Sequence, residues 1–577
     1  MPSCGKSLNL KCMVVIVLGA FFGLMGVASA QTDNWIGTTG VWSDSAQWDN
    51  GVPGSGENIV ISTSTANATD DFNLAIGTLT LGSASDTLVI PDGVALTVGG
   101  NISNAGNIQM SSAGSNSFLQ ITGSQSLTGT GSLTLGGAGL NFITGASGTG
   151  TEVLTSSNTI QGVGNIGNGV MGFVNTGTLN ANSAAGPLAV NVSSAGFNNT
   201  GTLQALSGGN LVIQGPLNSF LNFNGTTHVL SGGTYTANGG NIYFAAGMKG
   251  VTTLSARVTQ EAGGQLINTT TGTNAFSNLA TITSTGVLTT TQGFTQPGVF
   301  SMAGALNILP NTTVNVGSVK QIINNALTGG QWVLDFSLNI TGTPARIITN
   351  SATVTLSGGT FKNTADGSDA FASLTANKKS LRVMNFAHFT TNGSLANTGT
   401  MLVQKGCTMT IGGTGTSYSQ SLGKTTMDGM LKGGVNISGG TYLGAGSVTG
   451  AFSLGGGTGN ATFSVGDAGK TAQVKITGSY SQLANGILST PIAGTTVATQ
   501  YSQVKVTGPA TLGGTLAAPL LAGFTPTVGQ TFTVLSATSV TGAFSNSTIA
   551  INSSEHFAVS YTTTGAVLTV VSGPAAY

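Results

Sequence analysis

Charged side chains are scarce in this chain and make up only 6% of its 577 residues. Between Gln31 and Met248 there is no Lys or Arg, and nine acids give this stretch a net charge of minus nine. The residues that follow carry fourteen Lys and Arg against seven acids, a net charge of plus seven. Nucleic acids and anionic lipids are bound through dense Lys and Arg on one face. We therefore expect neither of them to be the principal partner.

Long hydrophobic runs are also missing, with one exception near the N-terminus. The 15 residues Met13–Val27 are all apolar or glycine, which is short of the roughly 20 that a helix needs to cross a bilayer. Two lysines precede this run and the small residues 28–30 follow it, as in a secretory signal peptide. We expect residues 1–30 to be removed near Ala30. The product is then a secreted or cell-surface protein without a transmembrane anchor.

Cysteine and histidine are nearly absent from the predicted mature chain. Only Cys407 remains after signal cleavage, which excludes an internal disulfide framework and a thiolate metal cluster. His228, His388 and His556 lie far apart, and no two of them have the spacing of metal ligands. We expect neither a metal nor another cofactor.

Aromatic residues are few, at 6%, whereas glycine is abundant, with 90 residues. Hydrophobic residues account for 40% and occur as pairs and triplets between Gly, Asn, Ser and Thr. Segments such as 94–98 and 474–476 alternate apolar and polar residues, which is typical of strands with one buried face. No helical pattern of comparable strength occurs. The composition predicts an all-β fold.

Short phrases recur along the chain and predict how the strands are arranged. Asn-Thr-Gly-Thr begins at Asn175, Asn199 and Asn397, and Ser-Gly-Gly-Thr plus an aromatic residue begins at Ser231, Ser357 and Ser438. The first two Asn-Thr-Gly-Thr copies lie 24 residues apart, a period typical of a solenoid. Gly and Asn accept positive φ at corners, and we expect the turn Asn and Thr to stack in ladders rather than to bind glycans. These features predict a parallel β-helix.

Such a rod has two open ends, and each is a row of unpaired strand groups that promotes aggregation unless it is covered. We therefore divide the mature chain into three parts. Residues 31–90, which contain three of the four Trp, form an N-terminal cap. Residues 91–470 form the β-helix repeats, with roughly 15 rungs at the usual strand spacing and a length on the order of 70 Å. Residues 471–577 form a C-terminal β-rich cap.

Both ends of the mature chain carry distinctive motifs. The first stretch contains Trp35-x-Gly37-x-x-Gly40-x-Trp42-Ser43 and Trp48-Asp49-Asn50-Gly51-Val52-Pro53, and the last contains Ile476-Thr477-Gly478-Ser479-Tyr480-Ser481-Gln482 and Leu512-Gly513-Gly514-Thr515-Leu516. The chain resembles bacterial secreted β-solenoid surface proteins related to autotransporter passenger domains of the autotransporter-associated β-strand repeat type. That resemblance implies a right-handed parallel β-helix at the cell surface, and no single activity. No translocator barrel pattern precedes Tyr577, so we expect release, noncovalent attachment or an anchor supplied by a partner.

A cluster of tryptophans near the predicted N-terminus of the mature chain is the first candidate site. Trp35, Trp42 and Trp48 lie within fourteen residues. Exposed indole faces suit the apolar face of a pyranose, which makes glycan stacking one interpretation. A hydrophobic plug over the first rung is the other, and we favour it because indole covers a large apolar area.

The most charge-rich stretch, residues 362–388, is the second candidate site. Its candidate groove residues are Asp366, Asp369, Lys378, Lys379, Arg382 and His388. In polysaccharide-active β-helix enzymes, acids and bases from neighbouring rungs line a groove. The alternative interpretation, which we favour, is a solvated loop that protrudes from the coil.

Three functions remain open. The first is a noncatalytic structural or adhesin-like surface protein whose partner is an extracellular polysaccharide or a cell-surface polymer. The second is a polysaccharide-active enzyme with its groove near residues 362–388, or a glycan-binding module. The third is self-association, because long strands of low charge join end to end when their edges are bare.

Overall fold

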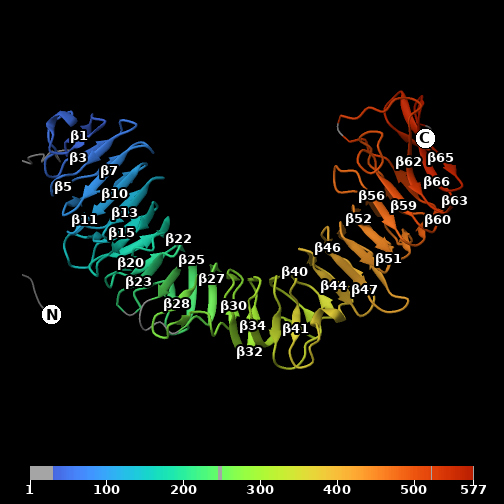
Figure 1. Cartoon of the computed structure of the whole chain (residues 1–577), viewed down its shortest axis with the longest axis horizontal. Helices are drawn as coiled ribbons and strands as arrows, with labels where there is room; N and C mark the ends of the chain where they lie inside the picture. The colour runs from blue at the N-terminus through green and yellow to red at the C-terminus, as the bar shows by residue number, and fades with distance from the viewer. Residues whose placement is uncertain (1–29, 217, 245–249, 522, 576–577) are drawn as a thin grey trace, which may run out of the picture.

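The computed structural model describes residues 30–216, 218–244, 250–521 and 523–575. These residues form a parallel β-solenoid of about 20 turns, with 52% strand and 1% helix. The predicted all-β parallel β-helix is therefore confirmed. The solenoid bends into an arc, with the N-terminal turns in one arm and the C-terminal turns in the other (Figure 1). The predicted signal peptide, except for Ala30, lies outside the described residues.

Helix occurs only as two short 3-10 segments among the described residues, η1 (Ser45–Gln47) and η2 (Ala370–Ser373). Each follows an aspartate that accepts a hydrogen bond from a backbone N–H of the first turn. Asp44 accepts from Ala46, and Asp369 accepts from Phe371. Neither segment approaches the length of a membrane-spanning helix. No helix in the described part of the chain is long and apolar enough to cross a membrane.

Each regular turn of the solenoid contributes one strand to each of three sides. In residues 102–121 the first side receives β9 (Ile102–Asn104), the second β10 (Asn107–Ser112) and the third β11 (Ser117–Ile121). The next turn stacks on this one in parallel. Its strands, on the first, second and third sides, are β12 (Gln125–Thr128), β13 (Ser132–Gly137) and β14 (Asn141–Gly145).

The second side runs through the whole arc, whereas the other two sides change sheets near its middle. Parallel pairing on the second side continues from β2 (Thr39–Val41) to β61 (Thr515–Ala517). The first and third sides each consist of separate sheets in the N-terminal and C-terminal halves. The continuous second side therefore joins the two arms into one coil.

The core is a column of inward-facing side chains from successive turns. Ile90 of β7 (Thr87–Pro91) lies in register with Met110 of β10, which lies in register with Leu135 of β13, and each is at most 1% exposed. Phenylalanines stack in the same way, as in Phe173 and Phe197, whose ring centroids are 5.7 Å apart. Burying one such side chain stabilises the fold by about 1.5–3 kcal/mol. A chain with few aromatic residues thereby builds one continuous core.

Asparagine side chains form ladders inside the corner between the first and second sides. Asn350 donates to Asn377 at 2.8 Å, and Asn377 donates to Asn397 at 2.7 Å. In the N-terminal half, Asn175 donates to Asn199 at 2.7 Å. All five side chains are fully buried. Asn175, Asn199 and Asn397 each begin a copy of Asn-Thr-Gly-Thr, so this repeat marks positions where buried amides satisfy one another.

At the N-terminal end of the solenoid, the outer edge of the first side is not bare. On the first side, β1 (Thr32–Trp35) carries an antiparallel contact with the segment around Trp48 along its outer edge. The N–H of Ile36 donates to the carbonyl of Gln47 at 2.8 Å, and the N–H of Asp49 donates to the carbonyl of Asn34 at 3.1 Å. These bonds satisfy backbone groups that would otherwise be open to another strand.

Parallel turns also begin inside this N-terminal region. The inner edge of β1 pairs in parallel with β3 (Asn58–Ile61), which pairs with β6 (Leu79–Leu81). Residues 31–90, for which we predict a cap, thus contain turns of the solenoid as well as the segment around Trp48 that bonds the outer edge of β1.

The C-terminal end of the solenoid changes from parallel to antiparallel pairing. On the third side, β62 (Thr531–Ser536) pairs antiparallel with β66 (Gly565–Ser572), which pairs antiparallel with β65 (Glu555–Thr562). On the second side, the Asn546 side chain accepts from the N–H of Leu516 and donates to its carbonyl, both at 2.9 Å. One amide thus satisfies both backbone groups of Leu516 in β61, the last strand of this side.

Candidate functional site

The tryptophan cluster lies inside the N-terminal end of the solenoid. Trp35, Trp42 and Trp48 are 1%, 0% and 3% exposed. Trp48 packs edge-on against Trp35 and Trp42, with ring centroids 5.1 and 5.5 Å apart, and its Nε1–H donates to the Trp42 carbonyl at 3.0 Å. Because the indole faces are buried against one another, this geometry favours the plug over glycan stacking.

The two acids of the 362–388 stretch are committed to their own loop, which follows β41 (Phe361–Asn363). Asp366 Oδ1 accepts from the backbone N–H of Ser368 at 2.9 Å and from its hydroxyl at 2.6 Å, and these bonds lower the pKa of Asp366. Asp369 Oδ1 accepts from the N–H of Phe371 at 2.8 Å, whereas burial raises the pKa of this carboxyl. Both carboxylates stabilise local turns, which favours the loop interpretation.

The basic residues of the same stretch are distributed around the coil. Lys378 and Lys379 lie at the corner after β42 (Ala376–Asn377), Arg382 lies in β43 (Ser380–Val383) on the second side, and His388 begins β44 (His388–Thr391) on the third side. All four side chains are exposed. Since these side chains come from different sides, the fold does not gather residues 362–388 into one groove.

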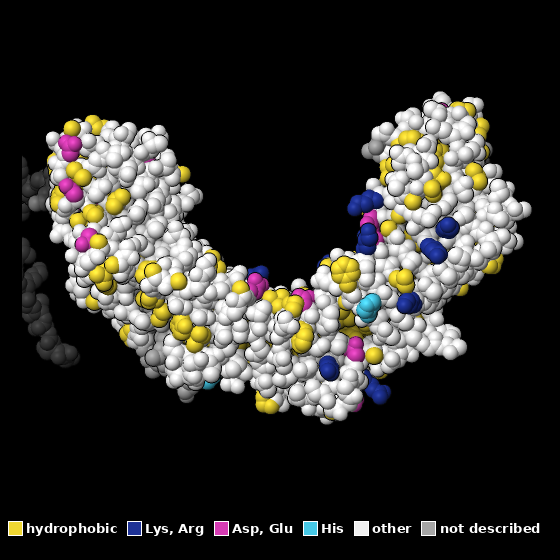
Figure 2. Space-filling model, viewed as in Figure 1, with side chains coloured by type: hydrophobic (Ala, Val, Ile, Leu, Met, Phe, Trp, Pro, Cys, Tyr) yellow, Lys and Arg dark blue, Asp and Glu magenta, His cyan; other side chains and the backbone are white. Residues whose placement is uncertain are grey.

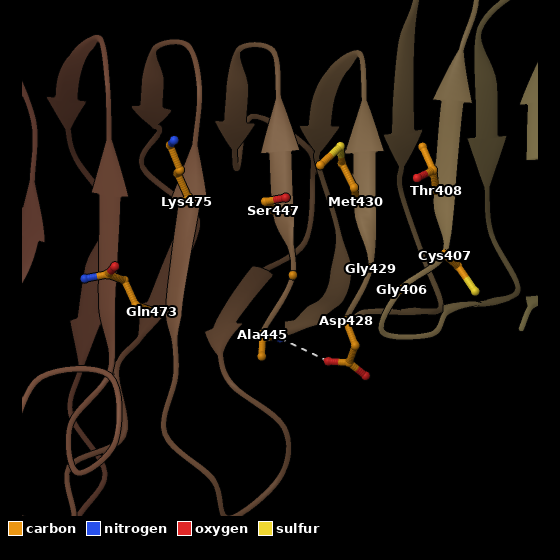
Figure 3. A pocket seen from close by; sticks show the side chains of 11 residues that line it. Gly406, Cys407, Thr408, Asp428, Gly429, Met430, Ala445, Ser447, Gln473 and Lys475 are labelled. Carbon is orange, nitrogen blue, oxygen red and sulfur yellow. Dashed lines mark hydrogen bonds between the residues drawn. The ribbon is translucent and has the colours of Figure 1, made fainter. Parts of the chain in front are cut away.

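A groove does occur on the third side of the C-terminal arm, and it is built from other residues. It encloses a cavity of about 350 Å³ where the second side turns into the third. Its lining comes from four successive turns (Figure 3) and consists of Gly406, Cys407, Thr408, Asp428, Gly429, Met430, Ala445, Gly446, Ser447, Gln473 and Lys475.

The wall of this groove is a row of outward-facing side chains on adjacent strands. Thr408 of β47 (Thr408–Ile411) is in register with Met430 of β50 (Met430–Lys432). Met430 is in register with Ser447 of β53 (Ser447–Thr449). Ser447 is in register with Lys475 of β56 (Gln473–Ile476). Figure 3 shows the four side chains side by side on neighbouring strands. We call them the third-side row.

The third-side row extends beyond the groove in both directions. His388 is in register with Thr408 at one end, and Lys505 of β59 (Gln503–Val506) is in register with Lys475 at the other. Of the residues predicted from the 362–388 stretch, His388 is therefore the one that the fold aligns with the groove.

Glycines at two successive corners, Gly429 and Gly446, form part of the groove lining. A Cβ added to Gly429 would lie 2.4 Å from the Cys407 carbonyl oxygen, and one added to Gly446 would lie 2.1 Å from the Gly429 carbonyl oxygen. Both distances are far below van der Waals contact, so glycine permits these corners to stack closely. Each of these two corners therefore has one position in the groove lining without a side chain, beside Asp428 and Ala445.

Asp428 is the acidic group of the groove. Its Oδ1 accepts from the N–H of Ala445 at 3.0 Å, and its side chain is half-buried. Burial raises the pKa of Asp428, and the negative charge of Asp467 adds to the rise, while the Ala445 bond and Lys470 oppose it. Glycoside hydrolysis ordinarily uses two carboxyl groups, and Asp428 is the one carboxyl among the described lining residues. No group of three or more His, Cys, Asp or Glu in the described part of the chain is placed to hold a metal.

Phe386 borders the groove at the corner between β43 and β44. Its side chain is 75% exposed, and its backbone has a left-handed φ of 62°, as does the preceding Asn385 at 55°. A Cβ on Gly406 would lie 2.6 Å from both Cδ1 and Cε1 of the Phe386 ring. The ring therefore sits directly over the backbone of a residue that lines the groove.

Sequence reasoning missed this groove because its residues are spread over four turns. The sequence does contain one signal, since a glycine lies one or two positions before the outward residue of three strands in succession, at Gly406, Gly429 and Gly446. Only the register between turns shows that Gly446 stacks on Gly429, whereas Gly429 itself lies opposite Cys407.

No protein-family model matches the sequence. No curated protein shows significant similarity to it either.

Proposed function

We propose that this protein is a noncatalytic, exported structural or adhesin-like solenoid that binds extracellular or cell-surface polysaccharide. One observation carries the proposal: the polar groups that would perform chemistry are instead used to build the coil. Buried amides are stacked in ladders, and Asp366 and Asp369 accept hydrogen bonds within their own loop. The groove of the C-terminal arm is open and lined by one carboxyl, which suits binding better than glycoside cleavage.

The covered ends support a role as a discrete rod rather than as an end-to-end fibre. At the N-terminus the outer edge of β1 is bonded by the segment around Trp48, and at the C-terminus Asn546 satisfies Leu516. Side surfaces are then the surfaces that remain for contact with a polymer.

Retention and cleavage on a panel of immobilised polysaccharides test this function together. Residues 31–577 are passed over each polymer, and new reducing ends or unsaturated sugars are assayed after prolonged incubation. We expect selective retention without any product. Depolymerisation that is lost in Asp428→Asn, or in Asp366→Asn with Asp369→Asn, would show that the protein is an enzyme. Absence of retention on every polymer would overturn the binding role.

The tryptophan cluster gives this experiment a second comparison. The Trp35, Trp42 and Trp48 triple-alanine variant is expected to lose stability at the N-terminal end while the C-terminal groove remains intact. Retention that disappears in a still-folded triple variant would move the binding site to the tryptophans.

A further inference from the structure

Phe386 has an unfavourable backbone conformation that the coil itself does not require. A bulky residue with a positive φ is an outlier, and here two consecutive non-glycine residues adopt it. The side chain also remains 75% exposed, so the fold recovers little from burying it. The next corner of the coil has Gly406 at a φ of 86°, which shows that glycine suits this kind of bend. An exposed ring held in a strained conformation points to a use outside the coil.

The ring of Phe386 is positioned as a platform at the border of the groove. The ring packs against the backbone of Gly406. The contact is so close that a side chain on residue 406 would collide with Cδ1 and Cε1 of Phe386. The flat apolar surface that stays exposed matches the C–H face of a sugar ring, and aromatic groups make such contacts without losing hydrogen bonds. A fixed platform also loses little side-chain entropy when a ligand binds.

Polar groups suited to sugar hydroxyls line the groove beside this platform. Thr408 and Ser447 offer hydroxyls, Gln473 offers an amide, and Asp428 offers a carboxyl. They come from four successive turns, whose strands lie about 4.8 Å apart, and the groove is open to solvent. An open groove with repeated polar contacts fits an extended chain better than a compact small molecule.

Two lysines at one end of the groove favour a negative charge on that chain. Lys475 and Lys505 are direct cross-strand neighbours and are both exposed. Like charges directly opposite each other destabilise a sheet, so a bound anion would relieve the repulsion. Lys and Arg gather on the C-terminal arm and are not seen on the N-terminal arm (Figure 2). Lys475 and Asp428 lie at different borders of the groove (Figure 3), which leaves the lysine end open to an anion.

We propose that this groove binds a linear polysaccharide containing uronic acids, with Phe386 stacking on a sugar ring and Lys475 and Lys505 pairing with carboxylates. This proposal rests on the proposed function and adds the ligand class and the site. The ligand spans the third-side row, from the Phe386 corner across Thr408 and Ser447 to the lysine pair.

Titration of residues 31–577 with polygalacturonate and with neutral dextran of similar length tests the proposal. We expect polygalacturonate to bind more tightly, with an affinity that falls as salt rises. Phe386→Ala should weaken binding about tenfold at all salt concentrations, and Phe386→Tyr should preserve it. Lys475→Gln with Lys505→Gln should remove the preference for polygalacturonate and most of the salt dependence.

A matched control comes from the N-terminal half. Leu221 is also an exposed apolar side chain, at 58%, and packs against a corner glycine, Gly196. Leu221→Ala should leave binding unchanged, which separates the groove from general loss of exposed apolar surface. Thermal melting and far-UV circular dichroism verify that each variant is folded.

The outcomes distinguish the site from the function. Binding that persists in both groove variants would overturn this site and leave polysaccharide binding standing, whereas no binding of any polymer would overturn both. Equal affinity for single-stranded DNA of the same charge would show a general polyanion surface and contradict the proposed specificity. A dimer of the unaltered protein that Phe386→Ala converts to a monomer, measured by light scattering, would show that the ring contacts a second copy instead.

Discussion

The two halves of this solenoid share their interior and differ on their surface. Both bury amide ladders at the same corner, Asn175 with Asn199 in one half and Asn350 with Asn377 in the other. Yet residues 31–248 contain no Lys or Arg, whereas the following residues are net positive and carry the groove. The inward and corner residues determine the coil, and the outward residues are free to differ. Functional differences along such a chain are therefore to be sought in the outward rows.

The covered N-terminal end provides the most severe test of this comparison. Deleting residues 31–90 removes the segment that bonds the outer edge of β1 and exposes strand edges of the following turns. We expect the remaining chain to assemble into fibres or aggregates, as size-exclusion chromatography and electron microscopy would show. A monomeric, soluble product would mean that the end segment does not protect the coil.

A buried carboxyl in the N-terminal half should make that half sensitive to pH. Asp70 is 0% exposed, and burial raises its pKa from 3.8 to about 8, with a smaller contribution from Asp71. The folded state therefore binds a proton that the unfolded state releases near pH 4. The free energy of unfolding is therefore highest below pH 4 and falls as the pH rises toward 8. At pH 7 the titration of Asp70 has lowered it by about 4 kcal/mol.

Asp70→Asn removes this titration and is expected to stabilise the N-terminal turns at pH 7 to 9. The fluorescence of Trp35, Trp42 and Trp48, monitored during urea unfolding at several pH values with Trp332 replaced by Phe, reports on that arm. If the unaltered protein and the variant lose stability in parallel between pH 4 and 8, Asp70 is not the titrating group.

The amide ladders allow the two halves to be compared at equivalent buried asparagines. Asn377 accepts a hydrogen bond from Asn350 and donates to both Asn397 and the Thr400 carbonyl. Asn377→Ala leaves buried partners unsatisfied and is expected to cost about 3 kcal/mol. Hydrogen exchange of the adjoining strands, followed by mass spectrometry, measures the local loss.

Asn199→Ala is the matched change in the N-terminal half and should cost less, about 2 kcal/mol. The Asn199 side chain accepts from Asn175 and from no other amide in the ladder, and its own Nδ2 has no hydrogen-bond partner. Equal losses at the two positions would show that ladder length, rather than the number of bonds per amide, determines stability.

The fold was predictable because its causes are local in sequence. Alternation as in Leu133 and Leu135 marks the strands, and Asn-Thr-Gly-Thr marks the amide ladder, so fold class follows without knowledge of the register. The groove has a different origin. Thr408 and Lys475 are 67 positions apart and share one row only because three turns of unequal length separate them. The left-handed φ of Phe386 likewise has no signature in residue type, since glycine or asparagine is the usual choice there.

Phe386 also offers the smallest and sharpest test of the division between coil and surface. Phe386→Gly relieves the left-handed conformation, and the greater freedom of glycine in the unfolded chain offsets part of that gain. We expect the folded state to gain about 0.5–1 kcal/mol, measured by urea unfolding, while polygalacturonate binding is lost. The reverse change in the N-terminal half, Gly139→Phe, places a ring at a corner with a φ of 79° and should destabilise that arm without creating binding. If Phe386→Gly weakens the fold instead, the ring packs for stability and the surface role assigned to it is wrong.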